Sequence, residues 1–248
     1  MMMETPTPDS TPADPIQPAG LLSMYLLVGI AILLIGSWAF YSIAEDVMEQ
    51  DAIVQIDQSI ADFVHASVTP STAQFMLILT MAGNELVVVV SLVLALALVL
   101  RRRWRDLLLL GLAVGGAEVI VPLIKLVVSR QRPVFSDPIQ VINNFSFPSG
   151  HSFLSVVFYG LIAYLLLRVT NSILARAAIM LAALAIILMV GFTRIYLGVH
   201  FMSDVLGGYL GGLAWLALTI TGVELLMRWQ ARRRAWRLRM ETNQPRSV

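Results

Sequence analysis

Long apolar runs recur along nearly the whole 248-residue chain and alternate with short polar segments. About 20 consecutive apolar residues allow a helix to cross a hydrocarbon core about 30 Å thick. Most of the runs approach or exceed that length, and the fourth and fifth are shorter. The pattern predicts an all-α fold, a bundle of six transmembrane helices in one domain. The predicted spans are residues 21–44, 75–100, 107–125, 152–167, 177–192 and 205–227.

Polar tails flank the predicted membrane domain, which covers residues 21–228. Residues 1–20 carry five prolines with threonine, aspartate and glutamate, and we expect this segment to be a disordered tail because it has little apolar surface to bury. Residues 229–248 are basic and are predicted to form a cytoplasmic tail that lies on anionic lipid headgroups. The first span lacks a preceding basic region and is too long for a signal-peptide core, so we expect it to be retained.

The segment 45–72 contains no lysine or arginine, and its apolar positions follow a helical period opposite three aspartates. Such a pattern is typical of an amphipathic helix that lies in the membrane surface. We therefore predict one amphipathic helix on the outer surface of the membrane. Its apolar positions are Ile53, Ile56, Ile60, Phe63 and Val64, and its aspartates are Asp51, Asp57 and Asp62.

The composition agrees with a membrane protein and excludes several other classes. Hydrophobic residues make up 58% of the chain and charged residues 13%, and the latter is about half the usual share of a globular domain. A net charge of +1 gives no argument for a nucleic-acid partner. Because the chain has no cysteine, it can form neither a disulfide framework nor a thiolate nucleophile.

Arginines predict the orientation, because loops rich in lysine and arginine stay in the cytoplasm. They concentrate at 101–105, at 168–176 and at 228–239, three regions that six spans place on one side. We therefore expect a multi-pass protein of the cell membrane with both termini in the cytoplasm. The segment 45–72 then lies on the outer side.

Four cations break this rule: Lys125, Arg130, Arg132 and Arg194 all fall in outer loops or at outer span ends. Lys125 is the only lysine in the chain, and it closes an apolar run. At 1.5 Å per residue it lies about 28 Å along the third span from Asp106, which places its ammonium group at the outer interface. A binding site for an anion would account for these charges.

Two further segments on the outer side point to the same anion. Ser149 follows Pro148 and resembles a helix start, whose free N–H groups and dipole favour a bound anion. His200 and Asp204 lie four residues apart, and thus on one face of a helix. Two of the three histidines, His151 and His200, belong to these segments.

Three motifs in order resemble the signature of the type 2 phosphatidic acid phosphatase superfamily, the integral membrane lipid phosphate phosphatases. The family pattern is a lysine followed after six residues by Arg-Pro, then Pro-Ser-Gly-His, then Ser-Arg, five residues, histidine, three residues and aspartate. Thr193 stands where the family usually has serine, and it retains the hydroxyl group. The matching residues are Lys125, Arg132 and Pro133; Pro148, Ser149, Gly150 and His151; and Arg194, His200 and Asp204.

The resemblance implies a phosphate-binding set that agrees with the needs of phosphoryl transfer, where positioning and neutralisation of charge dominate. Cationic side chains, a hydroxyl group and a backbone N–H would bind the phosphate oxygens. Glycine in this set lets the backbone approach closely. The set consists of Lys125, Arg132, Ser149, Gly150 and Arg194.

The catalytic roles also follow from the resemblance, in loops at 125–151 and 193–204. His200 would attack phosphorus and form a phosphohistidine, while Asp204 orients its imidazole. His151 would protonate the leaving oxygen and then activate water. No metal and no cofactor is expected, because Asp204 is the only carboxylate in the motifs and cations surround it.

The expected substrate is a phosphorylated membrane lipid at the outer leaflet, either a lipid phosphate or a diphosphate. Undecaprenyl diphosphate, phosphatidylglycerol phosphate, phosphatidic acid and lipid A phosphates all fit the motifs. One alternative is an anion or lipid transporter that uses the same basic cluster, but its cations would be spread across the membrane. Another is an enzyme like the vanadate-dependent haloperoxidases, which are soluble and have a similar anion pocket.

Four polar residues outside the motifs carry expectations of their own. His65 is interpreted as an interfacial residue of the amphipathic segment. Arg130 is expected to contact either phosphate or lipid headgroups. Glu85 and Glu118 fall within spans, where ionisable groups usually face an interior partner. Glu118 precedes Lys125 by about two helical turns, so a contact behind the site is one option.

Glycines within two spans predict close helix packing, because small residues four apart let helix backbones approach. This interpretation is favoured over a cofactor-binding loop. The glycines are Gly111 and Gly115 in the third span and Gly207, Gly208, Gly211 and Gly212 in the sixth.

Overall fold

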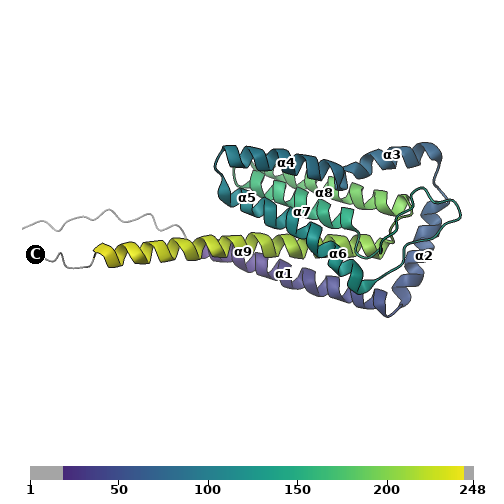
Figure 1. The fold of residues 1–248 in the computed structure, drawn as a ribbon, viewed down its shortest axis with the longest axis horizontal. Helices are drawn as coiled ribbons and strands as arrows, with labels where there is room; N and C mark the ends of the chain where they lie inside the picture. The colour runs from purple at the N-terminus through teal and green to yellow at the C-terminus, as the bar shows by residue number, and fades with distance from the viewer. Residues whose placement is uncertain (1–18, 243–248) are drawn as a thin grey trace, which may run out of the picture.

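The computed structural model describes residues 19–242, which form helices and loops without a strand (Figure 1). Most of the predicted disordered tail, residues 1–18, lies outside the described residues, as does the end of the basic tail, residues 243–248. The elements are α1 (Ala19–Met48), α2 (Ala52–His65), α3 (Pro70–Thr80), η1 (Met81–Gly83), α4 (Glu85–Leu100), α5 (Trp104–Leu110), η2 (Gly111–Gly115), α6 (Gly116–Val128), α7 (Gly150–Leu167), α8 (Ile173–Tyr196) and α9 (Met202–Thr242).

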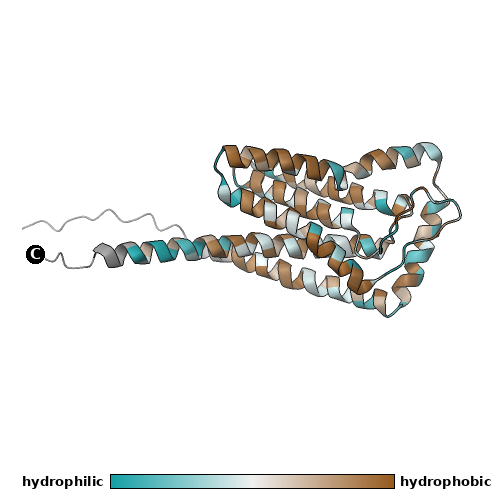
Figure 2. Cartoon of the chain, in the orientation of Figure 1, coloured by the Kyte–Doolittle hydropathy of each residue, from teal (hydrophilic) through white to brown (hydrophobic). Residues whose placement is uncertain are grey.

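The prediction of six membrane spans is confirmed. Within the described residues, six helical segments are long and apolar enough to cross a membrane. Two of them consist of several elements: α3, η1 and α4 form the second span, and α5, η2 and α6 form the third. The sixth span was predicted to end at Met227, but α9 continues as one helix to Thr242. Figure 2 shows the cause of the difference: the coloured part of α9 that projects from the bundle is largely hydrophilic, and hydropathy does not mark where such a helix stops.

Helix α7 lies inside the bundle and packs against α8, α9 and α6. Its side chains Phe153, Val157 and Leu161 are buried together with Leu109 and Leu110 of α5. Helix α1 packs along α9, and α3 packs on α8. The first turn of α7, which carries the Pro-Ser-Gly-His motif, is therefore held by the centre of the bundle.

Glycines of α9 bring this helix close to α7, as the sequence predicts. A Cβ atom at Gly208 would lie 2.7 Å from the carbonyl oxygen of Ser149, and one at Gly212 would lie 2.7 Å from that of Phe153. The same prediction is wrong for Gly111 and Gly115, where an added Cβ atom would have no neighbour within 4 Å among the described residues.

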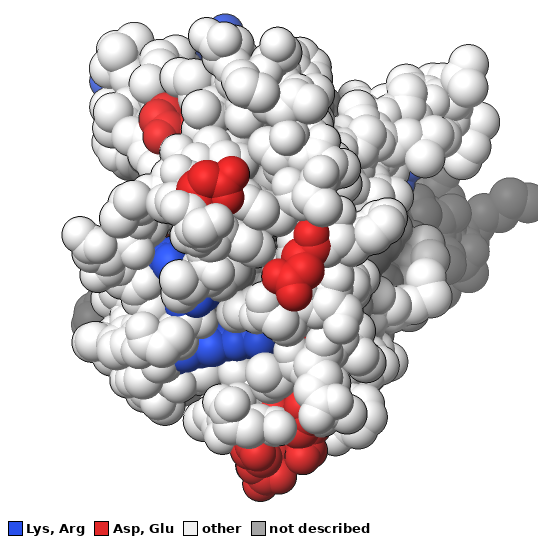
Figure 3. Space-filling model, turned by 90° about the vertical axis from the view of Figure 1, so that its right-hand side faces the viewer, with Lys and Arg blue, Asp and Glu red and all other residues white. Residues whose placement is uncertain are grey.

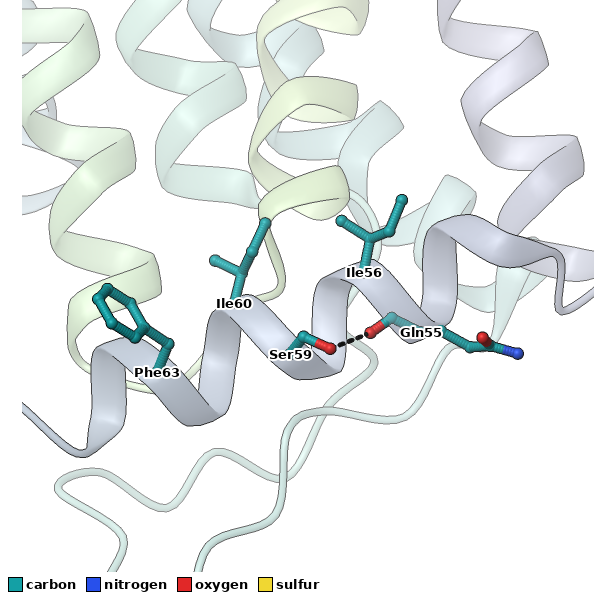
Figure 4. Close-up of a pocket in the computed structure, with 5 residues that line it drawn as sticks. All are labelled: Gln55, Ile56, Ser59, Ile60 and Phe63. Atoms are coloured by element: carbon teal, nitrogen blue, oxygen red, sulfur yellow. Dashed lines mark hydrogen bonds between the residues drawn. The ribbon is translucent and has the colours of Figure 1, made fainter.

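Helix α2 lies across one end of the bundle (Figure 1), so the predicted helix in segment 45–72 is confirmed. Ile56 and Phe63 are exposed, and with Ile60 they line an open recess of about 520 Å³ on the side of α2 that faces the ends of the bundle helices (Figure 4). Asp57 was predicted on the polar, solvated face, and this is wrong: it is 2% exposed. The helix thus turns a carboxylate toward the protein.

Arginine-rich segments gather at the opposite end of the bundle from α2. The turns between α4 and α5 and between α7 and α8 lie there, and α9 projects from that end (Figure 1). Some of these arginines form ion pairs, such as Arg168 with Asp106 at 3.0 Å. Glu85 and Glu118 were predicted to face interior partners, but both are exposed. Among the described residues, Lys125 donates to Phe145 and Ser146, and no hydrogen bond or ion pair joins it to Glu118.

Candidate active site

The candidate site lies at the α2 end of the bundle, where the loop 129–149 meets the last turn of α8 and the first turns of α7 and α9. Figure 3 views this end and shows lysine and arginine side chains in a hollow, with acidic side chains around it. The structure brings all three motifs to this place. The residues involved are Lys125, Arg132, Ser149, Gly150, His151, Arg194, His200 and Asp204.

Asp204, in the first turn of α9, is fully buried and accepts hydrogen bonds at both carboxylate oxygens. Its Oδ2 lies 3.3 Å from Nδ1 of His200 and 2.9 Å from the N–H of Phe201, and it accepts the hydroxyl of Ser146. Its Oδ1 accepts Nη1 of Arg130 at 2.7 Å. These hydrogen bonds hold the carboxylate in one orientation, and so it can orient the imidazole ring of His200 beside it.

His200 lies in the short loop between α8 and α9, and partners hold both nitrogens of its ring. Asp204 accepts a hydrogen bond from Nδ1, while Nη1 of Arg132 lies 3.1 Å from Nε2. These contacts select the tautomer that is protonated at Nδ1 and keeps its lone pair at Nε2. Burial lowers the pKa of His200 to about 3, against the opposing effect of Asp204. The imidazole is therefore neutral at physiological pH, as a nucleophile requires.

Arg132 reaches His200 from the loop 129–149 and is held by several acceptors. Its Nε donates to the carbonyl of Asn144 at 2.8 Å, and Nη1 also donates to the carbonyl of Val199. Burial lowers the pKa of the Arg132 guanidinium. Arginine starts from a pKa above 12, so the group remains a cation.

Lys125 lies in the last turn of α6, just before the helix ends at Val128. Its Nζ donates to the carbonyl oxygens of Phe145 at 2.5 Å and Ser146 at 3.1 Å. The ammonium group has three donors, so one remains for a further acceptor. Lys125 therefore ties the loop to α6 and brings a positive charge to the site.

Helix α7 begins at the site as predicted, with Ser149 as its N-cap residue. The Ser149 hydroxyl accepts from Ser152, and the Ser149 N–H donates to the backbone carbonyl of Asp204 at 2.9 Å. The N–H groups of Gly150 and His151 belong to the first turn, where no carbonyl of the helix reaches them. The positive end of the helix dipole thus faces the candidate site.

Arg194 is buried in the last turn of α8. Its Nη1 donates to the hydroxyl of Thr80 at 2.9 Å, while its Nε is buried without a partner among the described residues. A phosphate oxygen would satisfy such a donor, since a buried unpaired polar group is costly. Thr193 donates its hydroxyl to the carbonyl of Val190 at 2.6 Å within the helix, so its side chain is already engaged.

Arg130 and Asp57 were missed as members of the site. From the sequence, Arg130 was expected to contact either phosphate or lipid headgroups. In the structure its guanidinium is buried between Asp57 and Asp204, at 2.7 Å from each. Asp57 precedes Arg130 by 73 residues and fits the polar face of an amphipathic pattern, so no local signal pairs them.

His65 packs on the loop 129–149. Its ring stacks on Phe135 with centroids 3.8 Å apart, and its Nε2 lies 3.0 Å from Asp137. This hydrogen bond lowers the pKa of Asp137. The end of α2 is thereby attached to the loop that carries Arg130 and Arg132.

Comparisons with known proteins agree with this arrangement. Residues 106–228 match the family model described as the PAP2 superfamily. The chain belongs to the PAP2 superfamily. This confirms the resemblance found in the three motifs, because the match spans all of them.

Phosphatidylglycerophosphatase B of Bacillus subtilis (strain 168) is a relative of this PAP2 protein, with 39% identity over 114 residues. The alignment covers 46% of this chain and 55% of the relative, so it spans about half of the relative's length.

Two solved structures share the fold of this PAP2 protein. The transmembrane PAP2 type phosphatidylglycerolphosphate phosphatase from Bacillus subtilis has a TM-score of 0.68 and 28% identity, over 79% of this chain and 96% of that one. Aquifex aeolicus LpxE has a TM-score of 0.52 and 21% identity, over 66% and 94% of the two chains, and supports the fold alone. The predicted all-α membrane bundle is confirmed, and the protein is a multi-pass membrane protein.

Proposed function

We propose that this PAP2 protein is a lipid phosphatase that hydrolyses a lipid phosphate or diphosphate through a phosphohistidine on His200. The observation that carries the proposal is the geometry of that ring: Nδ1 faces Asp204, and the lone pair of Nε2 faces the cationic pocket at Arg132. A transporter has no need for a histidine oriented in this way.

Phosphate binding would fall to the groups around His200. Lys125, Arg132 and Arg194 supply positive charge, and the Ser149 hydroxyl and Gly150 N–H supply donors at the start of α7. Charge on the transferred phosphoryl group is spread over its equatorial oxygens, so donors from several directions stabilise the transition state. Arg132 would exchange its contact with Nε2 for one with phosphate as the nucleophile is released.

The reaction would proceed in two displacements. The Nε2 lone pair of His200 forms a bond to phosphorus while the bond from phosphorus to the lipid oxygen breaks, and His151 gives its proton to that oxygen. His151 then takes a proton from water, and the resulting hydroxide displaces Nε2 and releases inorganic phosphate. Asp204 stabilises the positive charge that develops on the imidazole in each step.

An apolar cavity of about 240 Å³ between α1, α6, α7 and α9 supports a lipid as the substrate. Phe153 lines it two residues after His151, and Ile124 lines it beside Lys125. The phosphate-binding groups and these apolar walls are therefore neighbours along α6 and α7. A lipid ester could place its headgroup at the phosphate-binding groups and part of its tail in the apolar cavity.

The proposed reaction takes place at the outer face of the membrane without a metal ion. The arginine-rich end would remain in the cytoplasm with both termini, which puts the opposite end outside. Among the described residues, no group of three or more histidine or acidic side chains is placed to hold a metal ion. Asp204, the carboxylate of the motifs, is already bonded to Arg130 and Ser146.

Phosphatidylglycerol phosphate is the first substrate to test, because the relative and the similar solved structure from Bacillus subtilis are both named as phosphatases of this lipid. The purified protein in detergent should be given this lipid, phosphatidic acid, undecaprenyl diphosphate and a lipid A phosphate in parallel, with release of phosphate as the measurement. Release from at least one lipid, lost in the His200→Ala variant, is the expected result. If no lipid is hydrolysed, the proposal is wrong. Bromide oxidation with added vanadate would then favour the haloperoxidase alternative, and anion uptake into vesicles the transporter.

A further inference from the structure

Arg130 lies between two buried carboxylates that are far apart in the sequence. Its Nη1 donates to Oδ1 of Asp204 at 2.7 Å, and its Nη2 donates to Oδ2 of Asp57 at 2.7 Å. The three residues are 8%, 0% and 2% exposed, respectively for Arg130, Asp204 and Asp57. One guanidinium thus connects α2 to the carboxylate that orients His200.

Ser203 closes this arrangement from α9. Its hydroxyl accepts from Nη1 of Arg130 at 2.6 Å and donates to Asp57, and its N–H donates to Oδ1 of Asp57 at 3.0 Å. The ring of Phe201 covers the guanidinium, with its centroid 4.3 Å from Cζ of Arg130. Asp57 therefore binds both Arg130 and the first turn of α9.

A buried group of three charges contributes little net stability to a fold. Removing two carboxylates and a guanidinium from water is costly, and apolar residues of similar size often stabilise a fold as well or better. A planar guanidinium does, however, hold two carboxylates in fixed directions. Orientation of Asp204 is the property that this arrangement provides.

We propose that Asp57 and Arg130 are positioning residues, which hold Asp204 and through it the Nδ1–H of His200 in the geometry for attack on a lipid phosphate. This inference rests on the proposed function. It makes α2 part of the catalytic machinery, although α2 carries no motif residue. Ser203 completes the link by joining Asp57 to the turn that carries Asp204.

Steady-state kinetics of charge-neutralising variants test the proposal. Asp57→Asn and Arg130→Gln should each lower kcat by about 10-fold or more, as loss of an orienting partner does, with KM changed less than about twofold. Arg130→Lys should recover part of the kcat lost in Arg130→Gln. The double variant should lose less than the product of the two single losses, because the two residues act on Asp204 through one connected set of contacts. Asp62→Asn, on the exposed side of α2, is the matched control and should keep the wild-type kcat.

A merely structural brace would give a different pattern. Thermal unfolding temperatures would fall for Asp57→Asn and Arg130→Gln, while kcat of the folded fraction stayed at the wild-type value. Effects of the two substitutions on kcat that multiply in the double variant would also overturn the proposal.

Nuclear magnetic resonance of the histidine rings provides a readout that does not need activity. The chain has three histidines, so the Nδ1–H of His200 can be assigned with a His200→Gln variant in 15N-histidine protein. We expect this resonance to shift or broaden in Asp57→Asn and to stay unchanged in Asp62→Asn. An unchanged resonance in Asp57→Asn would refute the positioning role. If wild-type protein hydrolyses no lipid, the proposed function fails, and the resonance still decides whether Asp57 orients His200.

Discussion

Nδ1 of His200 lies 3.3 Å from Oδ2 of Asp204, four residues later at the start of α9. The carboxylate is fully buried and holds the imidazole proton on Nδ1, so the lone pair of Nε2 is directed to the cationic side of the pocket. The reactivity of Nε2 should therefore depend on this contact.

Replacement of Asp204 by asparagine should abolish most of the activity while retaining the shape of the side chain. The amide can donate to Nδ1 and thus favour the tautomer with its proton on Nε2, where the lone pair is needed. We expect kcat to fall about 10³- to 10⁴-fold, measured as phosphate release from the preferred lipid. A fall of less than about tenfold would show that the carboxylate does not set the tautomer. Asp62→Asn is the matched control.

Lys125 should matter for both the reaction and the loop. Lys125→Met removes a positive donor, and loss of one such donor typically lowers kcat about 10²- to 10³-fold. It also removes bonds to the carbonyls of Phe145 and Ser146, so the unfolding temperature should fall modestly without loss of the fold. Arg101→Met, at the other end of the bundle, should leave both quantities unchanged. Wild-type kcat in Lys125→Met would contradict a contact with phosphate.

The buried imidazole of His200 should make stability depend on pH. Its pKa is about 3 in the folded chain and about 6.5 when exposed, so below pH 6.5 the unfolded chain binds the proton more readily. As far as His200 is concerned, the free energy of unfolding is highest above pH 6.5, and it decreases by on the order of 1 kcal/mol per pH unit as the pH falls toward 3. Between about pH 7 and pH 5, the unfolding temperature of wild-type protein should fall more than that of His200→Asn. Equal decreases would contradict a neutral buried ring.

The orientation of the site can be tested by labelling, because the natural chain has no cysteine. Asp137, in the loop above the site, and Arg234, in the exposed extension of α9, each accept a single cysteine. An impermeant thiol reagent should label position 137 in intact cells and position 234 only after lysis. The opposite pattern would place the site in the cytoplasm.

Much of the fold could be predicted from local pattern. A helix that crosses a membrane must pair its own backbone polar groups by hydrogen bonds, and its side chains form a long apolar run that is visible in the sequence. The same reasoning does not identify contacts. Gly208 and Gly212 approach α7 closely, whereas Gly111 and Gly115 face open space, and both sets have the same spacing. Likewise, the hydrophilic end of α9 gives no apolar signal for where the helix stops.

The site was predictable where motif residues are close in sequence or their spacing is distinctive, as for His200 and Asp204. The contact between Asp57 and Arg130 had no such signal. Asp57 fits the polar face of α2, and only the packing of α2 across the end of the bundle turns it inward. A pairing between residues 73 positions apart depends on tertiary structure, which a single sequence does not display.

The proposed mechanism requires His200 to carry the phosphoryl group, and trapping of the phosphoenzyme tests this most directly. Protein in excess EDTA would be mixed with lipid labelled with 32P at the phosphate, quenched within milliseconds at alkaline pH, where phosphohistidine survives, and the label on the protein counted. Wild-type protein should carry acid-labile label, His151→Ala should gain and lose it about 10²- to 10⁴-fold more slowly, and His200→Ala should carry none. Label on His200→Ala, or no label on wild-type protein that hydrolyses the lipid, would contradict the phosphohistidine mechanism.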